Sequence, residues 1–371
     1  MIRFKPAIIL LTSYLLFSAC SRTSSKHPSL FMPDNDNIRY SGRIDFANPQ
    51  NPKLSGAGAC FELKFTGNSC DVFLRDQNLY NNFNYFAIVV DDNYLGRIKM
   101  EKNKTKYQIA ENLKDTVHKL LVCKATEAQI GYVEFLGVLC NKILPSENSM
   151  TRKIEFIGNS ITCGMGLDIS GLPCDSGEWY DQHNAYLAYG PLVARKLNAD
   201  WLLSSVSGIG ITRSWNSPGP TMPQVYQDTY LSTDSTSLWD NRRYIPDMVS
   251  ICLGQNDFSK GNGSYDRPAL DSARFVNEYI RFAGRIRNHY PYAQICCLTS
   301  PMLDEKESVT MSNYLSAVIT YMKEVKNDNM IHMFCFSRSY VSGCSSHPGK
   351  EDHEKMAEEL LPFYKHIMSW Q

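Results

Sequence analysis

The chain has 371 residues, a length that favours two domains. Lys plus Arg number 38 and Asp plus Glu number 38, so the formal net charge at pH 7 is zero. Charge alone therefore predicts no binding to nucleic acid or to an anionic lipid surface. The hydrophobic content of 43% is ordinary for a globular protein and allows a sizeable core.

The N-terminus has the features of an export signal. A basic start with Arg3 and Lys5 precedes an apolar run over residues 7–17, which is followed by two small residues and Cys20. The run is short for a membrane-spanning helix. A Cys directly after small residues resembles a bacterial lipobox, although Phe17 stands where Leu is usual at position −3. The alternative is a plain secretory signal that is cleaved nearby.

Acylation of Cys20 would make residues 1–20 the signal segment and would anchor the exported chain to a membrane surface without inserting it. The polar stretch over residues 21–37 then reads as a flexible tether. Both the periplasmic side and the cell surface stay open as the location, and the oligomeric state stays open as well.

Twelve cysteines are present, and export makes disulfides permissible. No Cys-x-x-Cys pair occurs, which argues against a structural zinc site. Cys163 and Cys174 are candidates for a bridge beside the site described below. Cys296 and Cys297 are neighbours on a predicted strand, so they point to opposite faces and should not pair with each other. An odd number of cysteines remains once Cys20 is set aside, so at least one should be free.

From residue 38 to residue 145 the chain reads as short strands. Strands are predicted over residues 60–65, 70–74, 85–90, 119–124 and 132–139. Short strands separated by turn signals, such as the one at residues 91–93, predict an antiparallel β-sandwich. Residues 145–151 are polar and read as a linker.

From residue 151 to residue 371 the pattern changes to α/β. Strands are predicted over residues 154–157, 201–206, 248–253, 295–298 and 331–336, and helices over residues 185–197, 271–287, 311–325 and 356–367. Strands that alternate with helices predict a mainly parallel sheet with helices on both faces. Ligand sites in such sheets lie beyond the carboxyl ends of the strands.

Four segments with catalytic potential stand at the predicted strand ends. Ser160 follows the first strand, where a sharp strand-to-helix turn can expose a hydroxyl. Gly208 follows the second strand and Asn256 the third, and both can present N–H groups to a developing oxyanion. His347 precedes the last helix and can reach Ser160 as a general base. Each residue also has a non-catalytic interpretation: Ser160 as a helix N-cap, the Gly and Asn as turn residues, and His347 as a surface residue. Four such features in this order are much less expected by chance.

In this order the four segments resemble the blocks of the SGNH (GDSL-like) hydrolases, and the resemblance covers residues 151–371. The front half resembles the N-terminal jelly-roll domain of carbohydrate esterase family 2, on residues 42–45, 65–67, 123–127 and 131–137. The resemblance implies a flavodoxin-like hydrolase domain behind a jelly roll, and an enzyme that deacetylates polysaccharides or oligosaccharides.

The resemblance also implies the roles of individual residues. Ser160 is the nucleophile and His347 the general base. The oxyanion hole consists of the backbone N–H groups of Ser160 and Gly208 and of the side chain of Asn256. The chemistry is a two-step acyl transfer that needs neither a metal nor an organic cofactor.

Two positions depart from the family pattern. Asn159 stands where an Asp usually precedes the nucleophile, and Cys344 stands where an Asp usually lies three residues before the His. Because that acid normally fixes the imidazole tautomer, another group should orient His347. We favour a Ser–His dyad in which a backbone carbonyl accepts the imidazole N–H. Asp352 and a Cys344 thiolate are the less favoured alternatives.

Other residues compete for a role in the site. His353 is a second candidate base, although it reads more simply as a solvated residue of the last helix. His183 and Trp179 lie in a long insert that we expect to wall the cleft. Trp215 and Tyr265 are further candidates for stacking on a sugar.

Two other functions remain open from the sequence. One is a lipase-like or aryl-ester hydrolase on the same scaffold. The other is a carbohydrate-binding lipoprotein with a decayed site, which Asn159 and Cys344 motivate.

Overall fold

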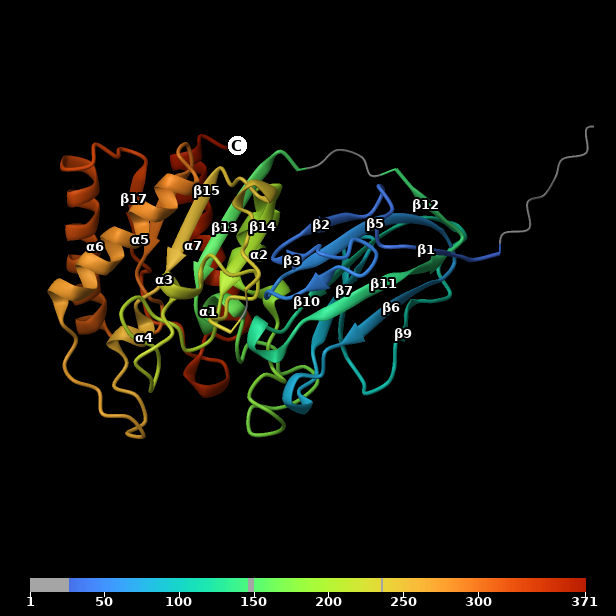
Figure 1. The fold of residues 1–371 in the computed structure, drawn as a ribbon, viewed down its shortest axis with the longest axis horizontal. Coiled ribbons are helices and arrows are strands. Elements are labelled where there is room, and N and C mark those ends of the chain that lie inside the picture. Colours follow the sequence, from blue (N-terminus) through green and yellow to red (C-terminus); the bar gives the residue numbers. More distant parts are fainter. Residues whose placement is uncertain (1–26, 146–149, 235) are drawn as a thin grey trace, which may run out of the picture.

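The computed structural model describes residues 27–145, 150–234 and 236–371. The predictions for Cys20 and for the signal segment lie outside these residues. A β-sandwich and an α/β domain lie side by side along the long axis of the molecule (Figure 1). Within the described residues, no helix is long and apolar enough to cross a membrane.

The sandwich consists of two antiparallel sheets of six strands each. The first has the order β3-β4-β11-β6-β9, with β1 paired to β11, and the second has the order β12-β5-β10-β7-β8, with β2 paired to β5. The first sheet contains β1 (Ser29–Phe31), β3 (Ile44–Asp45), β4 (Lys53–Leu54), β6 (Cys70–Asp76), β9 (Lys106–Ala110) and β11 (Val133–Cys140). The second contains β2 (Arg39–Ser41), β5 (Cys60–Gly67), β7 (Tyr85–Val90), β8 (Asn93–Lys99), β10 (Thr116–Lys124) and β12 (Lys142–Leu144).

Alternation along the strands places apolar side chains between the two sheets. Phe61, Leu63 and Phe65 on β5 are buried, and Phe61 stacks on Phe135 of β11 with ring centroids 3.9 Å apart. Every second residue of a strand points to the same face of the sheet. The apolar residues of the predicted alternating pattern therefore form the core between the two sheets.

Part of the predicted tether belongs to the sandwich instead. Residues 29–31 form β1 and pair antiparallel with β11, so that Ser29 lies opposite Cys140. Tyr40 donates its hydroxyl to the carbonyl of Pro33 at 2.7 Å and fixes the following turn. The segment carries no alternating pattern because an edge strand gains backbone hydrogen bonds whatever its side chains are.

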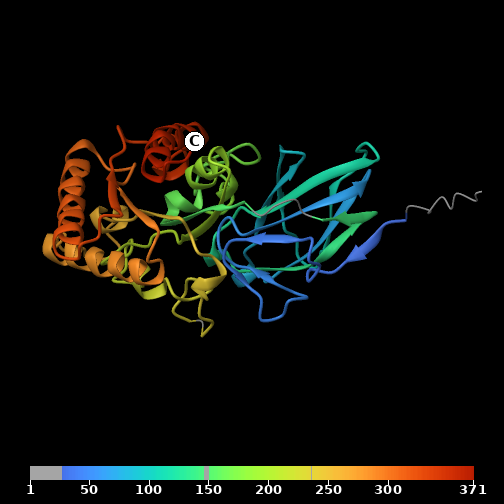
Figure 2. The same cartoon turned by 90° about the horizontal axis from the view of Figure 1, so that it is seen from above.

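The α/β domain has one parallel sheet with the strand order β14-β13-β15-β16-β17. Its strands are β13 (Arg152–Gly158), β14 (Ala199–Ser205), β15 (Met248–Cys252), β16 (Gln294–Leu298) and β17 (Ile331–Phe334). The longer helices are α2 (Tyr189–Lys196), α5 (Ser272–His289), α6 (Glu305–Glu324) and α7 (Lys350–Met368). Helices α2 and α7 cover one face and α5 and α6 the other (Figure 2). This confirms the predicted fold class.

Adjacent residues of the sheet enter two different cores. Phe156 packs with α2 and α7, whereas Ile157 packs with α5 and α6. Cys296 and Cys297 are divided in the same way and both are free, as predicted for neighbours on a strand.

Short helical segments lie mainly in the loops. They are η1 (Leu79–Asn81), η2 (Ala128–Ile130), α1 (Ser160–Cys163), η3 (Ala185–Leu187), α3 (Met222–Val225), η4 (Asn241–Arg243), α4 (Gln255–Phe258) and η5 (Cys344–Ser346). Of these, α1, α4 and η5 follow β13, β15 and β17 in the chain and bring their residues to the carboxyl edge of the sheet.

The two domains share buried polar contacts. Arg43 of the sandwich is fully buried and donates to the carbonyls of Asp228 and Tyr226 at 2.8 and 2.9 Å. Its guanidinium lies 3.9 Å from the buried carboxylate of Glu155 on β13. A core of apolar residues, among them Cys123 and Trp201, also crosses the boundary. The carboxyl edge of the parallel sheet is therefore held against the sandwich.

We expect Arg43→Met to lower the free energy of unfolding by about 3 kcal/mol or more, because it leaves the buried Glu155 carboxylate without its cation. Chemical unfolding monitored by tryptophan fluorescence measures the change. The matched control is Arg39→Met, which removes a partly exposed ion pair with Asp200 and should cost less than about 1 kcal/mol. Equal losses of unfolding free energy in the two variants would contradict a stabilising role of the buried Arg43–Glu155 pair.

Candidate active site

The turn from β13 into α1 presents Ser160. A Cβ at Gly158 would lie 2.0 Å from Oγ1 of Thr162, so the turn requires glycine at this position. Asn159 caps the helix, and its Oδ1 accepts the N–H of Ile161 at 3.0 Å. Asn serves as an N-cap as well as Asp does, which accounts for Asn159 at a position where the family usually has the acid. Ser160 is the first residue of α1, and it is 5% exposed.

His347 comes from the loop before α7 and meets Ser160. Its Nε2 lies 2.8 Å from Oγ of Ser160, and its Nδ1 lies 3.1 Å from the carbonyl oxygen of Ser345. A carbonyl can only accept, so Nδ1 carries the proton and Nε2 is free to accept the serine proton. The carbonyl of Ser345 is thus the backbone acceptor of the imidazole N–H that we favoured from the sequence.

The environment keeps the imidazole neutral. Burial lowers the pKa of His347, and the nearby His183 lowers it further, while the carbonyl of Ser345 opposes the shift. A neutral imidazole at neutral pH is the form that a general base requires.

The candidate oxyanion donors line the same cavity. Gly208 has a positive φ of 77°, which glycine adopts without strain, and it lines the cavity together with Trp215. Asn256 donates one amide hydrogen to the carbonyl of Ile209 at 2.8 Å, which leaves the second for a ligand. The cavity has a volume of about 670 Å³ and includes both residues together with Ser160 and His347. The predicted site residues are therefore brought together.

Asp257 fixes the loop that follows Gly208, a role that the sequence analysis did not assign. Its buried carboxylate accepts the N–H groups of Thr212 at 2.7 Å and of Ile211 at 2.9 Å. Burial raises the pKa of Asp257, although these hydrogen bonds oppose the shift. The only signal in the sequence was its place directly after Asn256.

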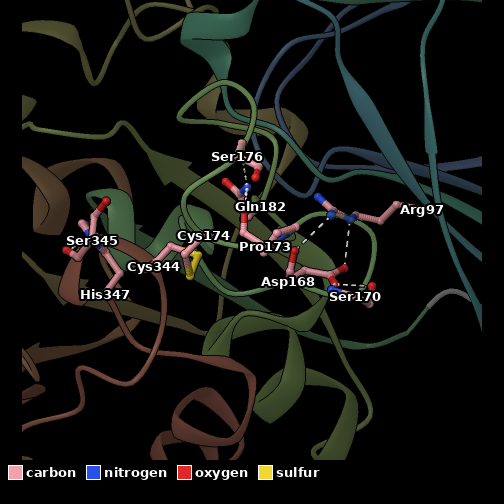
Figure 3. The surroundings of a disulfide bond; sticks show 10 residues. All are labelled: Arg97, Asp168, Ser170, Pro173, Cys174, Ser176, Gln182, Cys344, Ser345 and His347. Carbon is pink, nitrogen blue, oxygen red and sulfur yellow. Dashed lines mark hydrogen bonds and ion pairs between the residues drawn. A yellow bond between two sulfur atoms is a disulfide. The ribbon is translucent and has the colours of Figure 1, made fainter.

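A disulfide joins Cys174 of the insert to Cys344 (Figure 3). This corrects the expected bridge between Cys163 and Cys174. Cys163 is buried on the inner side of α1, where its thiol donates to Glu127 at 3.0 Å, and it cannot reach the insert surface. Cys344 is likewise excluded as a thiolate partner of His347, because its sulfur is already bonded.

The sandwich holds the insert in place. Nε of Arg97, on β8, lies 2.9 Å from the carboxylate of Asp168, and Nη1 donates to the carbonyl of His183 at 2.5 Å. Figure 3 shows Arg97 and Asp168 on one side of the insert and the disulfide on the other. The loop of His347 is thus connected through the insert to the neighbouring domain.

His353 is not the base. It is fully buried rather than solvated, its Nδ1 accepts the N–H of Tyr189 at 3.1 Å, and burial lowers its pKa to about 3. Asp352 does not orient His347 either, because its carboxylate accepts the N–H of Ser342 at 2.8 Å and anchors the loop. The last helix packs against α2, and this contact buries the side chain that the sequence placed in solvent.

Some of the aromatic residues proposed to line the cleft do so, and others do not. Trp179 and Trp215 line the cavity and are 43% and 49% exposed, whereas Tyr265 does not line it. His183 does not wall the cleft, because it is fully buried beneath Trp179, with ring centroids 5.1 Å apart. Among the described residues, no group of three or more His, Cys, Asp or Glu side chains could hold a metal ion.

A serine hydroxyl and an imidazole in hydrogen-bond contact at the carboxyl edge of a parallel sheet define a serine hydrolase of the α/β class. Residues 40–146 match the family described as carbohydrate esterase 2 N-terminal, and residues 154–360 match the GDSL-like lipase/acylhydrolase family.

Relatives support the same grouping. The chain is 32% identical to the cellulase/esterase CelE of Acetivibrio thermocellus, over 91% of this chain and 40% of that protein. It is 26% identical to an acetylxylan esterase / glucomannan deacetylase of Cellvibrio japonicus, over 98% of both. The structure of a family two carbohydrate esterase from Clostridium thermocellum in complex with cellohexaose shares 31% identity and a TM-score of 0.80, over 90% of this chain and all of that one. The chain therefore belongs to carbohydrate esterase family 2, and it is a carboxylic ester hydrolase.

We expect the double variant Cys174→Ser/Cys344→Ser to lower kcat by about 10- to 100-fold, because the loop that positions His347 loses its covalent support. Hydrolysis of p-nitrophenyl acetate measures the loss, and reduction of the wild type with dithiothreitol should reproduce it. Cys335→Ser, which removes an exposed free thiol, is the control. Wild-type kcat in the double variant would show that the bridge does not position the base.

Proposed function

We propose that this chain removes O-acetyl groups from polysaccharides or oligosaccharides through an acyl-enzyme on Ser160. The observation that carries the proposal is the 2.8 Å contact between Oγ of Ser160 and Nε2 of His347 beside an open cavity. This contact supports Ser160 as the nucleophile and His347 as its base.

In the first step, Oγ of Ser160 attacks the acetyl carbonyl while Nε2 of His347 takes the hydroxyl proton. The oxyanion that forms receives the backbone N–H groups of Ser160 and Gly208 and the free amide hydrogen of Asn256. The carbon–oxygen bond to the sugar then breaks, and the imidazolium returns its proton to the departing sugar oxygen.

In the second step, a water molecule loses a proton to Nε2 of His347 and attacks the acetyl-serine. The ester bond to Ser160 then breaks, and the imidazolium of His347 returns its proton to Oγ, which restores the hydroxyl. Acetic acid leaves and loses its proton to the solvent as acetate. The Ser345 carbonyl holds the Nδ1 proton in both steps, so Nε2 remains the atom that exchanges protons.

The shape of the surface favours a carbohydrate. A second hollow of about 740 Å³ adjoins the catalytic cavity and shares Gln129, Ser207, Gly208 and Trp215 with it. The combined space exceeds that needed for an acetyl group, and Trp179 and Trp215 offer exposed rings at its wall. Cellohexaose bound to the clostridial relative supports a polysaccharide chain as the occupant.

We expect Ser160→Ala to lower acetate release from acetylated xylan and glucomannan at least about a thousandfold, because among the described residues only the hydroxyl of Ser160 is in hydrogen-bond contact with His347. Ser316→Ala, which changes an exposed serine of α6, is the matched control. p-Nitrophenyl esters of increasing acyl length, run in parallel, should show a preference for acetate. Equal rates in wild type and Ser160→Ala would favour a binding protein, and a preference for long acyl chains would favour a lipase.

We also propose that the chain is exported and anchored through an acylated Cys20. The support is the basic, apolar and small-residue order of the N-terminal sequence. Expressed in a bacterium, the wild type should incorporate a labelled fatty acid and enter the detergent phase of Triton X-114, whereas Cys20→Ala should do neither. Cys335→Ser is the control. Unlabelled wild-type protein in the aqueous phase would contradict the anchor.

A further inference from the structure

A group of buried titratable side chains lies behind the Ser160–His347 pair, and the proposed mechanism gives it no task. It comprises Lys124, Glu127, Cys163 and His183, all of them fully buried, and we refer to it as the Glu127 cluster. The first two belong to the sandwich, Cys163 to α1 and His183 to the insert. Charged groups seldom lie this deep at a domain boundary without a specific partner.

The carboxylate of Glu127 connects the two segments that carry the proposed backbone oxyanion donors. Its Oε2 accepts the N–H of Ser207 at 2.6 Å, and Ser207 directly precedes Gly208. The same oxygen accepts the thiol of Cys163 at 3.0 Å, in the short helix that begins at Ser160. A single side chain of the sandwich therefore fixes both segments relative to each other.

A second residue of the same loop holds Ser207 from the other side. The amide of Gln129 donates to the carbonyl of Ser207 at 3.0 Å. The Ser207 peptides are thus fixed at both the N–H and the carbonyl, and Gly208 follows directly. Because oxyanion donors act only when they are preorganised, this support bears on the rate of acyl transfer.

The side chain of Glu127 also carries a negative charge. Burial alone would raise the pKa of Glu127, but His183 beside it and the hydrogen bonds from Cys163 and Ser207 lower it below its ordinary value. The carboxylate is therefore ionised at neutral pH. Nε2 of His183 lies 3.8 Å from Oε1 of Glu127, and neither atom has a hydrogen-bond partner among the described residues.

Lys124 and Cys163 are the other titratable groups of the Glu127 cluster. Lys124 donates its Nζ to the carbonyls of Thr126 and Glu127, and burial lowers its pKa to about 7. Burial likewise raises the pKa of Cys163, so this thiol stays neutral. The negative charge of Glu127 raises the pKa of His347, against the larger effect of burial and the effect of His183, both of which lower it.

We propose that Glu127 is a positioning residue of this esterase, which fixes the two oxyanion segments through Ser207 and Cys163 and supplies the buried negative charge that the site lacks at Cys344. The carboxylate does not touch His347 or the substrate. It acts through the backbone that it holds and, across a medium of low dielectric, on the imidazolium that forms in each step. The inference rests on the proposed esterase function.

The decisive variant is Glu127→Gln, which keeps the size and one acceptor oxygen but removes the charge. We expect kcat for p-nitrophenyl acetate to fall at least about tenfold, with KM within about twofold, because the loss falls on the transition state. The pH profile gives the second readout. Catalysis needs neutral His347, and the charge of Glu127 raises its pKa, so removal of the charge should move the acidic limb of kcat/KM to lower pH.

The matched control is Glu134→Gln, which removes a carboxylate of β11 that pairs with Arg75 at the surface. It should leave both kcat and the acidic limb unchanged. A fall in kcat in Glu127→Gln with an unmoved limb would reduce Glu127 to a structural residue and overturn the proposal, as would wild-type values of both.

Should Glu127→Gln fail to give a folded protein by circular dichroism, Glu127→Asp supplies the test. It keeps the charge and shortens the reach, so kcat should fall while the limb stays in place, and a shifted limb would overturn the proposal. Wild type and Ser160→Ala are assayed in the same series. An inactive wild type refutes the esterase function, whereas an active wild type with an unaffected Glu127→Gln refutes only the role of Glu127.

Discussion

Charged groups that lose contact with water must find partners, and in this chain they find them across the boundary between the two domains. Arg43 reaches from the sandwich to Glu155 on β13 of the parallel sheet, and Arg97 reaches to Asp168 in the insert. Glu127 contacts Cys163 and Ser207 of the hydrolase domain, behind Ser160. Separation of the domains would leave these charges buried without partners or would require their hydration, so the boundary favours one fixed arrangement. The catalytic edge of the sheet is consequently a product of both domains.

In the proposed Ser160–His347 dyad, a neutral carbonyl stands where a catalytic triad has a carboxylate. The Ser345 carbonyl fixes the imidazole tautomer but brings no charge, and burial keeps His347 unprotonated. Such a base is ready to accept the proton of Ser160 but gains less when it becomes an imidazolium. The rest of the electrostatic support must come from dipoles and from more distant charges. Cys344 stands at the position of the missing acid and serves the site through its covalent bond to the insert.

Helices and strands whose apolar pattern extends over several turns or alternations could be predicted from the sequence. Single contacts between residues far apart in the chain could not. The five parallel strands and the long helices follow from apolar periodicity, and the rule that ligand sites lie beyond strand ends was enough to place Ser160 near His347. Helix α1 has four residues and shows no period. The partner of Cys174 lies 170 residues away, a separation at which spacing carries no information. Glu127 could not be distinguished from other polar loop residues in the sequence, because the groups that contact its carboxylate, Cys163 and Ser207, belong to the other domain.

The same long separation has a consequence for biosynthesis. Cys344 follows Cys174 by 170 residues, so the bridge can close only once the sandwich and most of the α/β domain have been synthesised. Before Cys344 is made, other cysteine thiols of the chain could form a non-native disulfide with Cys174. Eight of the nine free cysteines of the described residues are buried, which removes these competitors as soon as their strands and helices pack. Correct pairing thus depends on folding that precedes oxidation, and a maturation assay that follows Cys174 would report the order of the two events.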